Sequence, residues 1–258
     1  MNYNYHTHTY RCFHATGTME EYVKRAIDCG IEYMGFSEHI PFILSDGTQI
    51  YYRMRMEEIN NYFEDVKYLK EKYKGKINIS VGFEMEYYKD SFRIMYKTAK
   101  DSGAEYLILG QHCHAPENTI NKIYSTTGTD SEEILCTHVD SVVEAIKTGV
   151  FTYVAHPDIF LFHGDRELLK KEWKKIAVAS REYNTPLEIN FLGIRQNRPY
   201  PDEMFWELAG EEKSPVTFGF DAHDVLNAYD GKSLPVAKKM VEKYNLNYIG
   251  KPILKPLK

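Results

Sequence analysis

The chain has few cysteines, no long apolar run and no flexible linker, and each absence excludes a class of protein. Only four of its 258 residues are cysteines and no two form a C-x-x-C pair, which argues against a disulfide framework. No stretch approaches the roughly 20 apolar residues of a membrane-spanning helix. The first residues lack the basic and apolar regions of a signal peptide. We therefore expect a cytoplasmic protein with four unpaired thiols, Cys12, Cys29, Cys113 and Cys136.

An excess of basic residues is also absent. The formal net charge is −5 at pH 7, which argues against a surface that binds nucleic acid. A small anionic molecule is not excluded, because bound divalent cations reverse the sign of the charge inside a pocket. No proline-, glycine- or serine-rich segment divides the chain, and its length fits one α/β barrel. We expect a single domain over residues 1–258 whose partner is a small molecule.

Short apolar segments of β type alternate with longer amphipathic segments of helical period. After a first strand that ends just before His6, strands are expected over about residues 33–37, 77–83, 106–109, 151–154, 186–189 and 216–220. Helices are expected over about residues 18–29, 56–73, 90–102, 131–148, 166–183, 202–209 and 234–244, and loops over residues 115–128 and 190–201. Strands that alternate with helices form parallel βαβ units. Seven such repeats predict an α/β fold, a distorted TIM-like (β/α)7 barrel.

Residues of metal-binding type follow nearly every predicted strand. They are His6, His8, His14, His39, Glu84, His112, His156, Asp221 and His223. In an α/β barrel the chemistry collects at the carboxyl ends of the strands, where all of these side chains fall. Imidazole nitrogens and carboxylate oxygens gathered at one end of a barrel are what a site for several metal ions requires. The sequence therefore predicts a multinuclear metal centre.

Other histidines and acidic residues fit this pattern less well. His138 lies within a helical segment, and His114 and His163 lie on loops, so these three are interpreted as structural or surface residues. Glu86 competes with Glu84 for the position on the third strand. Glu84 is preferred because it directly follows the apolar run.

These motifs, in their order, closely resemble those of the polymerase-and-histidinol-phosphatase (PHP) superfamily. The matching segments are His6-Thr7-His8, Ser37-Glu38-His39, Gly82-Phe83-Glu84, His112, Ala155-His156-Pro157 and Asp221-Ala222-His223, which span essentially the whole chain. Residues 14–22, 35–39, 187–190, 193–195 and 200–201 are similar to the histidinol-phosphatase branch. Gln111 before His112 and the loop 115–128 depart from the family's pattern. Both lie near the pocket mouth, so they bear on substrate identity more than on reaction type.

The resemblance implies three divalent metal ions, which would be Zn, Fe or Mn. The first would be held by His6, His8, Glu84 and Asp221, the second by Glu84 as a bridge with His112 and His156, and the third by His14, His39 and His223. It also implies a phosphate monoester hydrolase, most specifically a histidinol-phosphatase that releases L-histidinol and phosphate in histidine biosynthesis. Two alternatives stay open. One is a PHP phosphoesterase that acts on a nucleotide or sugar phosphate, and the other is a metal-binding accessory module without catalysis, which an intact ligand set disfavours.

The expected reaction is in-line attack on phosphorus by water whose pKa is lowered by the metals. Glu84 and Asp221 are the predicted catalytic residues, and either Asp221 or a second water would supply the proton that the leaving alcohol needs. Arg195 is predicted to bind the phosphate, because a guanidinium offers two parallel donors to phosphate oxygens. Arg198 is the weaker alternative for this role.

Overall fold

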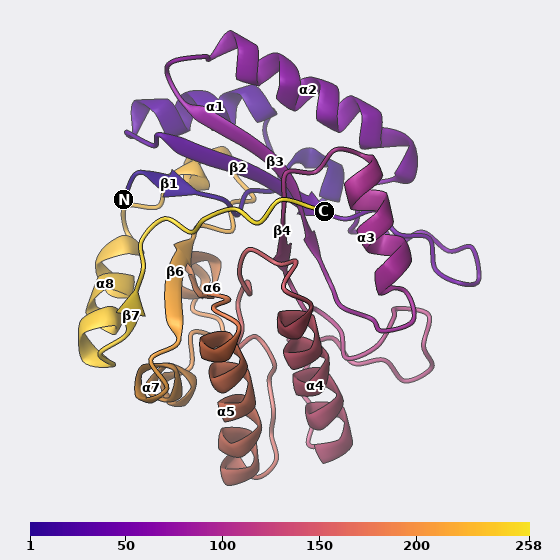
Figure 1. Ribbon diagram of the computed structural model, residues 1–258, viewed down its shortest axis with the longest axis vertical. Helices are drawn as coiled ribbons and strands as arrows, with labels where there is room; N and C mark the ends of the chain where they lie inside the picture. The colour runs from indigo at the N-terminus through magenta and orange to yellow at the C-terminus, as the bar shows by residue number, and fades with distance from the viewer.

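The computed structural model describes residues 1–258 and shows a curved parallel sheet surrounded by helices (Figure 1). The strands are β1 (Tyr3–Asn4), β2 (Tyr33–His39), β3 (Asn78–Met85), β4 (Tyr106–Leu109), β5 (Leu187–Asn190), β6 (Pro215–Gly219) and β7 (Asn247–Tyr248). The α-helices are α1 (Met19–Asp28), α2 (Ile59–Lys72), α3 (Phe92–Asp101), α4 (Glu132–Thr148), α5 (Arg166–Glu182), α6 (Phe191–Gln196), α7 (Glu203–Glu211) and α8 (Leu234–Lys243). Short 3-10 helices are η1 (Tyr10–Cys12), η2 (Met56–Glu58) and η3 (Val225–Ala228).

The sheet is parallel throughout and follows the order of the chain. Strands β1, β2, β3 and β4 form one run, and β5, β6 and β7 form a second. Isolated parallel bridges at Val154 join the two runs, because this residue pairs with Leu109 of β4 and with Leu187 of β5. A further parallel bridge pairs Thr7, after β1, with Ala222, after β6. The curved sheet thus returns to its first strand, which confirms the predicted TIM-like α/β architecture.

Two local predictions are wrong in extent or kind, and one short strand was not predicted. Residues 151–154 form no regular strand: only Val154 makes bridges, and the chain leaves the sheet at His156, whose φ of 31° lies outside the extended region. The predicted loop 190–201 begins with helix α6, because the Asn190 side chain caps it by accepting a hydrogen bond from Gly193 N at 3.1 Å. Strand β7 was not predicted, since two residues are too few to show a period.

Local signals in the sequence place most helices where they were expected. Thr18 and Glu21 form a capping box at the start of α1, with the Thr18 hydroxyl 3.3 Å from Glu21 N and the Glu21 carboxylate 2.7 Å from Thr18 N. Helix α4 ends at Gly149, which adopts a left-handed φ of 71°.

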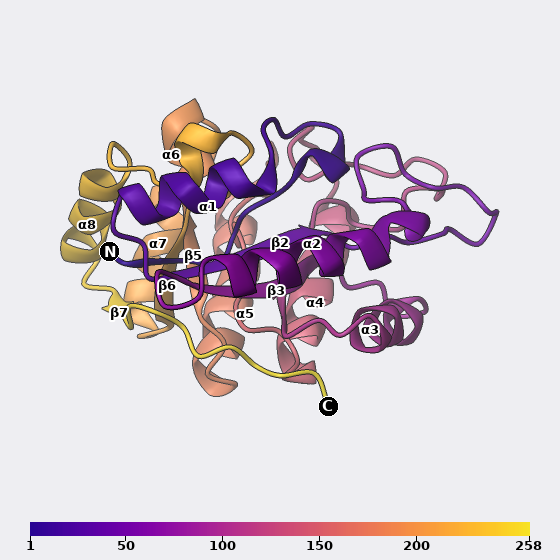
Figure 2. The ribbon, with the colours of Figure 1, turned by 90° about the horizontal axis from the view of Figure 1, so that it is seen from above.

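Seen from above, α1 and α2 lie over β2 and β3 (Figure 2). Crossing a bilayer demands a length and an apolar character that no helix of the structure has.

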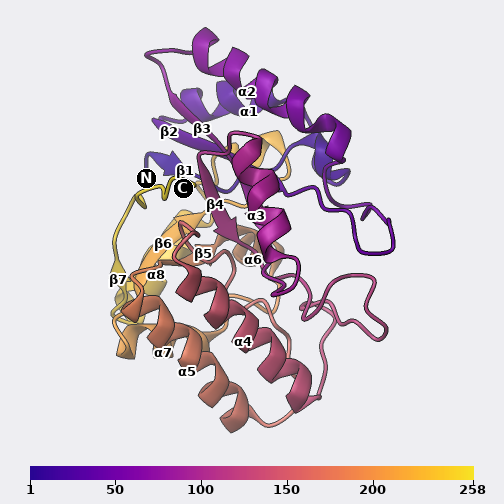
Figure 3. The same ribbon diagram turned by 45° about the vertical axis from the view of Figure 1, so that its right-hand side comes forward.

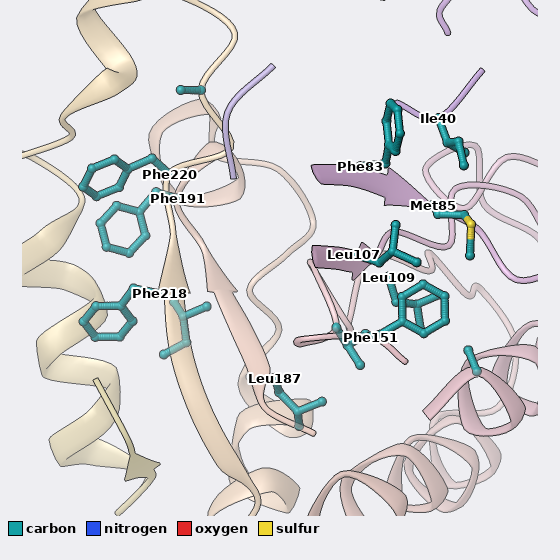
Figure 4. Close-up of a cluster of buried hydrophobic side chains, with 14 of the residues drawn as sticks. Ile40, Phe83, Met85, Leu107, Leu109, Phe151, Leu187, Phe191, Phe218 and Phe220 are labelled. Carbon is teal, nitrogen blue, oxygen red and sulfur yellow. The ribbon is translucent and has the colours of Figure 1, made fainter. Parts of the chain in front are cut away.

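Apolar side chains between the sheet and the helices form one large core cluster. It runs from Met19 in α1 to Leu246 before β7, so the whole length of the chain contributes to it. Figure 4 shows Phe191, Phe218 and Phe220 grouped beside β5 and β6. It also shows Leu107, Leu109 and Phe151 grouped near β4. Each buried side chain of this size contributes about 1.5–3 kcal/mol, so the core holds the sheet rigid beneath the site.

A second cluster, rich in tyrosine, fills the interior of the sheet at the amino ends of the strands. Its members are Tyr3, Tyr5, Tyr106, Ile108, Tyr153 and Ala155, and Leu254 of the C-terminal tail packs against them. The tail runs from β7 across this end of the sheet (Figure 3). Lys255 N donates a hydrogen bond to Thr152 Oγ1 at 3.2 Å, which fastens the tail there. The amino ends are therefore closed, and the open cavity lies at the carboxyl ends.

Candidate metal centre

The nine residues predicted to bind metals lie together at the carboxyl ends of the strands. Eight of them line one cavity of about 600 Å³, namely His8, His14, His39, Glu84, His112, His156, Asp221 and His223. The ninth, His6, lies directly behind this surface, with Nε2 3.6 Å from both Glu84 Oε1 and Asp221 Oδ1. The structure thus brings the whole set together.

Glu84 stands at the centre of the set and uses both carboxylate oxygens. Its Oε1 lies 2.9 Å from His156 Nε2 and 3.5 Å from His112 Nε2. Its Oε2 lies 3.2 Å from His39 Nδ1 and 3.3 Å from His8 Nε2. A carboxylate whose two oxygens face two different groups of imidazoles has the geometry of a bridge between metal ions.

Several atoms of the set are buried without any hydrogen-bond partner. They are His6 Nε2, His8 Nε2, His39 Nδ1, Glu84 Oε2 and Asp221 Oδ1. Buried polar atoms in proteins nearly always have a partner, so five unpartnered nitrogen and oxygen atoms around one space call for a cation. Three triads of donor atoms lie close enough together to share an ion: His6, His8 and Asp221; His6, Glu84 and His156; and His8, His39 and His223. The residues present therefore fit bound divalent metals.

Protonation states differ across the set. Burial opposes protonation of His6 and His8, but neighbouring carboxylates outweigh it and raise the pKa of His6 well above that of a free imidazole and that of His8 to about 9, so these rings release a proton when they bind a metal. Other members are already in the form that binds. Burial opposes ionisation of Glu84, but the charges of His112 and His6 hold its pKa well below the usual range. Burial lowers the pKa of His39 well below that of a free imidazole, and burial with the charge of His8 lowers the pKa of His223 to about 4. Ionised carboxylates and neutral imidazoles are the forms that bind metal ions.

Three carboxylates that the sequence analysis did not assign lie behind the histidines. Each faces the Nδ1 of one ring: His6 to Glu188 at 2.8 Å, His112 to Glu86 at 2.8 Å and His8 to Glu38 at 3.4 Å. A carboxylate at Nδ1 fixes the ring so that Nε2 faces the metal, and it raises the basicity of the ligand. The sequence does carry a signal for these three residues. Each is an acidic residue within or next to a buried strand, where a charged side chain requires a partner.

Backbone conformation also shapes the centre. His156 and Asp221 adopt positive φ values of 31° and 48°, which side chains other than glycine rarely do. At Gly110 a Cβ atom would lie 2.0 Å from Glu84 Oε1, so only glycine leaves room for the central carboxylate. The positions of Glu84 and Asp221 therefore depend on a closely fitted backbone.

His14 lies at the exposed rim of the set. Its ring stacks on His223 with 4.7 Å between centroids, and its Nδ1 lies 2.7 Å from the carbonyl oxygen of Cys12, which leaves Nε2 for the cavity. The Cys12 thiol is also near this pair. Burial raises the pKa of Cys12, and its Sγ donates to Thr9 O at 3.1 Å, so the protonated thiol is a packing group.

Arg195 does not line the cavity. Its guanidinium lies behind Asp221 and donates hydrogen bonds to the backbone carbonyl oxygens of Phe220 and Asp221. Arg198, the weaker sequence alternative, does line the cavity, where its Nη1 donates to Tyr200 Oη at 3.0 Å. Both arginines follow β5, and only the turn at the end of α6 decides which one faces the open space.

The rest of the cavity wall combines four tyrosines with polar and aliphatic side chains and contains no further carboxylate. Tyr51, Tyr52, Tyr124 and Tyr200 line it, and Glu84 and Asp221 are its only acidic side chains.

The three histidines interpreted as structural or surface residues, His114, His138 and His163, do not line the cavity. Gln111, which departs from the family's pattern, has a structural role because its Oε1 accepts a hydrogen bond from Tyr87 N at 2.8 Å.

Comparison with known proteins agrees with this geometry. The model of the PHP domain matches residues 4–191. A probable histidinol-phosphatase of Deinococcus radiodurans is 24% identical over 234 residues, which cover 84% of this chain and 85% of that protein. The histidinol-phosphatase of Bacillus subtilis is 25% identical over 258 residues, which cover 87% of this chain and 96% of that protein.

A solved structure shows the same fold over nearly the whole chain. It is the histidinol phosphate phosphatase of Lactococcus lactis complexed with zinc, L-histidinol and phosphate. The TM-score is 0.69 at 17% sequence identity, and the match covers 96% of this chain and 95% of that one.

Proposed function

Because the chain belongs to the PHP domain family, we propose that it is a metal-dependent hydrolase of phosphate monoesters that acts on L-histidinol phosphate. The observation that carries the proposal is the convergence of nine histidine and carboxylate side chains, five of which direct a buried donor atom without a hydrogen-bond partner into the shared space. Relatives named histidinol-phosphatase match most of the chain and support the choice of substrate. The cytoplasmic location and the lack of a nucleic-acid partner stay predictions.

Three divalent ions are proposed, with the ligands assigned as in the family. His6, His8, Glu84 and Asp221 would hold the first, Glu84, His112 and His156 the second, and His14, His39 and His223 the third. Mixed imidazole and carboxylate ligands suit Zn, Fe or Mn. The two-sided contacts of Glu84 support its role as the bridge between the first two ions.

The chain's own groups then position the substrate and move one proton. When bound, the metals supply a water of lowered pKa and neutralise charge on the phosphoryl oxygens. Arg198, the only arginine or lysine side chain of the cavity wall, binds the phosphate. In the reaction a bond forms between phosphorus and the oxygen of water, and the bond to the alcohol oxygen breaks. Asp221, ionised because His6 and His223 outweigh its burial and lower its pKa, takes the proton from water and passes it to the alcohol.

One observation favours a second substrate class. The ammonium group of histidinol needs a partner, yet both carboxylates of the cavity wall belong to the metal set. A small phosphate without an amine, such as a sugar phosphate, would need no such partner. The aromatic wall would accommodate an imidazole ring or a nucleobase equally well.

Steady-state release of phosphate from a panel of monoesters tests these alternatives. Histidinol phosphate, a nucleoside monophosphate and a sugar phosphate would be compared at equal Zn²⁺ or Mn²⁺ concentrations. We expect the highest kcat/KM for histidinol phosphate. A higher value for another ester would transfer the assignment to that substrate, and no turnover of any ester would favour the accessory module.

A further inference from the structure

A buried arginine next to the metal centre has no part in the proposed reaction. Arg53 is 1% exposed, and it lies between Glu86 and Glu117, which are equally buried. Its Nη1 donates to Glu86 Oε2 at 2.7 Å, its Nε donates to Glu117 Oε1 at 3.1 Å, and its Nη2 also donates to Glu117. Charges buried this deeply are tolerated only when each is paired, so the three side chains hold one another in place.

Both ends of this cluster reach the cavity wall. Glu86 Oε1 lies 2.8 Å from Nδ1 of His112, a proposed metal ligand. Glu117 Oε1 accepts a hydrogen bond from Tyr52 Oη at 2.6 Å. His112 and Tyr52 line the same cavity, and the chain His112–Glu86–Arg53–Glu117–Tyr52 runs behind its surface. We call these five residues the Arg53 relay.

The relay also joins three separate segments of the chain. Arg53 and Tyr52 belong to the loop between β2 and η2, Glu117 belongs to the loop between β4 and α4, and Glu86 directly follows β3. The two loops project side by side on the same flank of the molecule (Figure 3). Asn118 Nδ2 donates to Ser45 Oγ at 3.0 Å across them, but Arg53 is the only charged link. One guanidinium therefore fixes both loops to the strand that carries Glu84.

We infer that Arg53 is a positioning residue that couples the metal ligand His112 to Tyr52, the wall against which the leaving group binds. The statement that Tyr52 contacts the leaving group rests on the proposed function. The statement that Arg53 supports the metal ligand His112 does not. Tyr52 is suited to the role because its ring stands edge-on to that of His39, with centroids 5.9 Å apart. Coupling of this kind is reciprocal: if ordered loops favour metal binding, then metal binding orders the loops by the same factor.

Four substitutions along the relay test the inference, because each cuts it at a different point. Glu86→Gln cuts the metal side, Glu117→Gln and Tyr52→Phe cut the loop side, and Arg53→Met cuts both. Glu172→Gln removes a carboxylate of similar burial on α5, away from the cavity, and Tyr96→Phe removes a distant hydroxyl. Zn²⁺ affinity is measured by dialysis against buffered metal. Loop order is measured with and without Zn²⁺ by the rate of tryptic cleavage after Arg55 and after Lys122, two sites that every variant keeps.

The expected results separate along the relay. Glu86→Gln weakens Zn²⁺ binding by about 10–100-fold, as loss of a carboxylate behind a ligand typically does. Arg53→Met weakens it in the same direction, because Glu86 loses the partner that holds it against His112. Tyr52→Phe and Glu117→Gln leave Glu86 against His112, so they lower the Zn²⁺ affinity only by the coupling factor, about threefold. They raise KM about tenfold with little change in kcat, because the wall is no longer held in place. Zn²⁺ slows cleavage of both loops in the parent protein and in the two controls, and this protection is lost in Arg53→Met.

A purely structural role for Arg53 predicts a different pattern. Thermal stability would fall in every relay variant, while Zn²⁺ affinity, KM and metal-dependent protection stayed as in the parent, and that outcome overturns the inference. If Arg53→Met fails to fold, the comparison of Glu86→Gln with Glu117→Gln tests the inference instead. Equal effects of these two substitutions on the Zn²⁺ affinity would also overturn the inference. If the parent hydrolyses no ester, the proposed function fails, but the affinity and cleavage measurements still test the coupling.

Discussion

Single residues control the metal centre through close contacts. Glu84 reaches imidazoles from the ends of four other strand segments because Gly110 leaves space for its carboxylate. Glu188 orients His6 and also accepts a hydrogen bond from His156 N at 3.1 Å. A small change at either position therefore alters the site without touching the open cavity.

Substitution of Gly110 by alanine is expected to lower metal content. The added Cβ would lie 2.0 Å from Glu84 Oε1, so the carboxylate must move away from its histidines. We expect at least a tenfold loss of Zn²⁺ affinity, measured by dialysis, with an unchanged circular dichroism spectrum. Gly75→Ala serves as control, because Gly75 has a φ of 78° and free space, so its substitution costs stability alone. Equal metal content in both variants would contradict the prediction.

The two arginines after β5 are expected to give different phenotypes. Arg198→Ala should lower kcat/KM by roughly 10²-fold, or ~2.7 kcal/mol, with unchanged metal content, and Arg198→Lys should recover part of the loss. Arg195→Ala should instead lower metal content, because Arg195 holds the carbonyl oxygens on either side of the strained Asp221 backbone. Atomic absorption and steady-state kinetics on both variants distinguish the roles. A variant of Arg195 that keeps its metal and loses only phosphate binding would restore the original assignment.

At the scale of elements, helix α4 carries a buried histidine that makes stability depend on pH. His138 is 1% exposed and packs against Phe160 with ring centroids 4.5 Å apart. Burial and, to a lesser degree, the charge of His114 lower its pKa to about 3. Below the ordinary imidazole pKa the unfolded chain binds a proton that the folded chain does not, so the free energy of unfolding falls as the pH falls.

His138→Leu is expected to remove this part of the pH dependence. Between about pH 6 and pH 4 the parent should lose up to ~1.4 kcal/mol per pH unit more than the variant, since one proton is taken up on unfolding. Urea unfolding at several pH values in the presence of a chelator measures the difference, because removal of metal eliminates its own pH dependence. Parallel curves for the two proteins would show that His138 is protonated in the folded state.

At the scale of the whole molecule, the fold and the metal centre are expected to be separable. The core cluster spans the chain from α1 to the end of α8, and the tyrosine cluster closes the opposite end of the sheet. Removal of metal should abolish hydrolysis, lower the melting temperature by the linkage between binding and folding, and leave the far-ultraviolet circular dichroism intact. Readdition of Zn²⁺ or Mn²⁺ to the chelated protein should restore activity. Loss of secondary structure on chelation would mean that the metals are needed for the fold itself.

The sequence by itself determined most of the strands and helices, the end of the sheet that carries the site and the nine residues that meet there. These follow from local patterns, because apolar period, capping residues and the polar residue after each strand are all read within a short window. Two examples are the capping box that starts α1 and the apolar run of β3 that precedes Glu84. The same motifs, taken in order, were enough to identify the PHP family.

Only the tertiary structure decided which groups support the ligands. Glu188 faces His6 across 182 positions of the sequence, and Arg53 meets Glu117 across 64, so no local pattern connects them. The turn that ends α6 places Arg198, and not Arg195, at the cavity wall. The strand at Val154 is reduced to isolated bridges beside the positive φ of His156. Side chains that act through others are placed by packing among distant segments. That packing exists only once the sheet has curved round and brought the segments after β1 and β6 together.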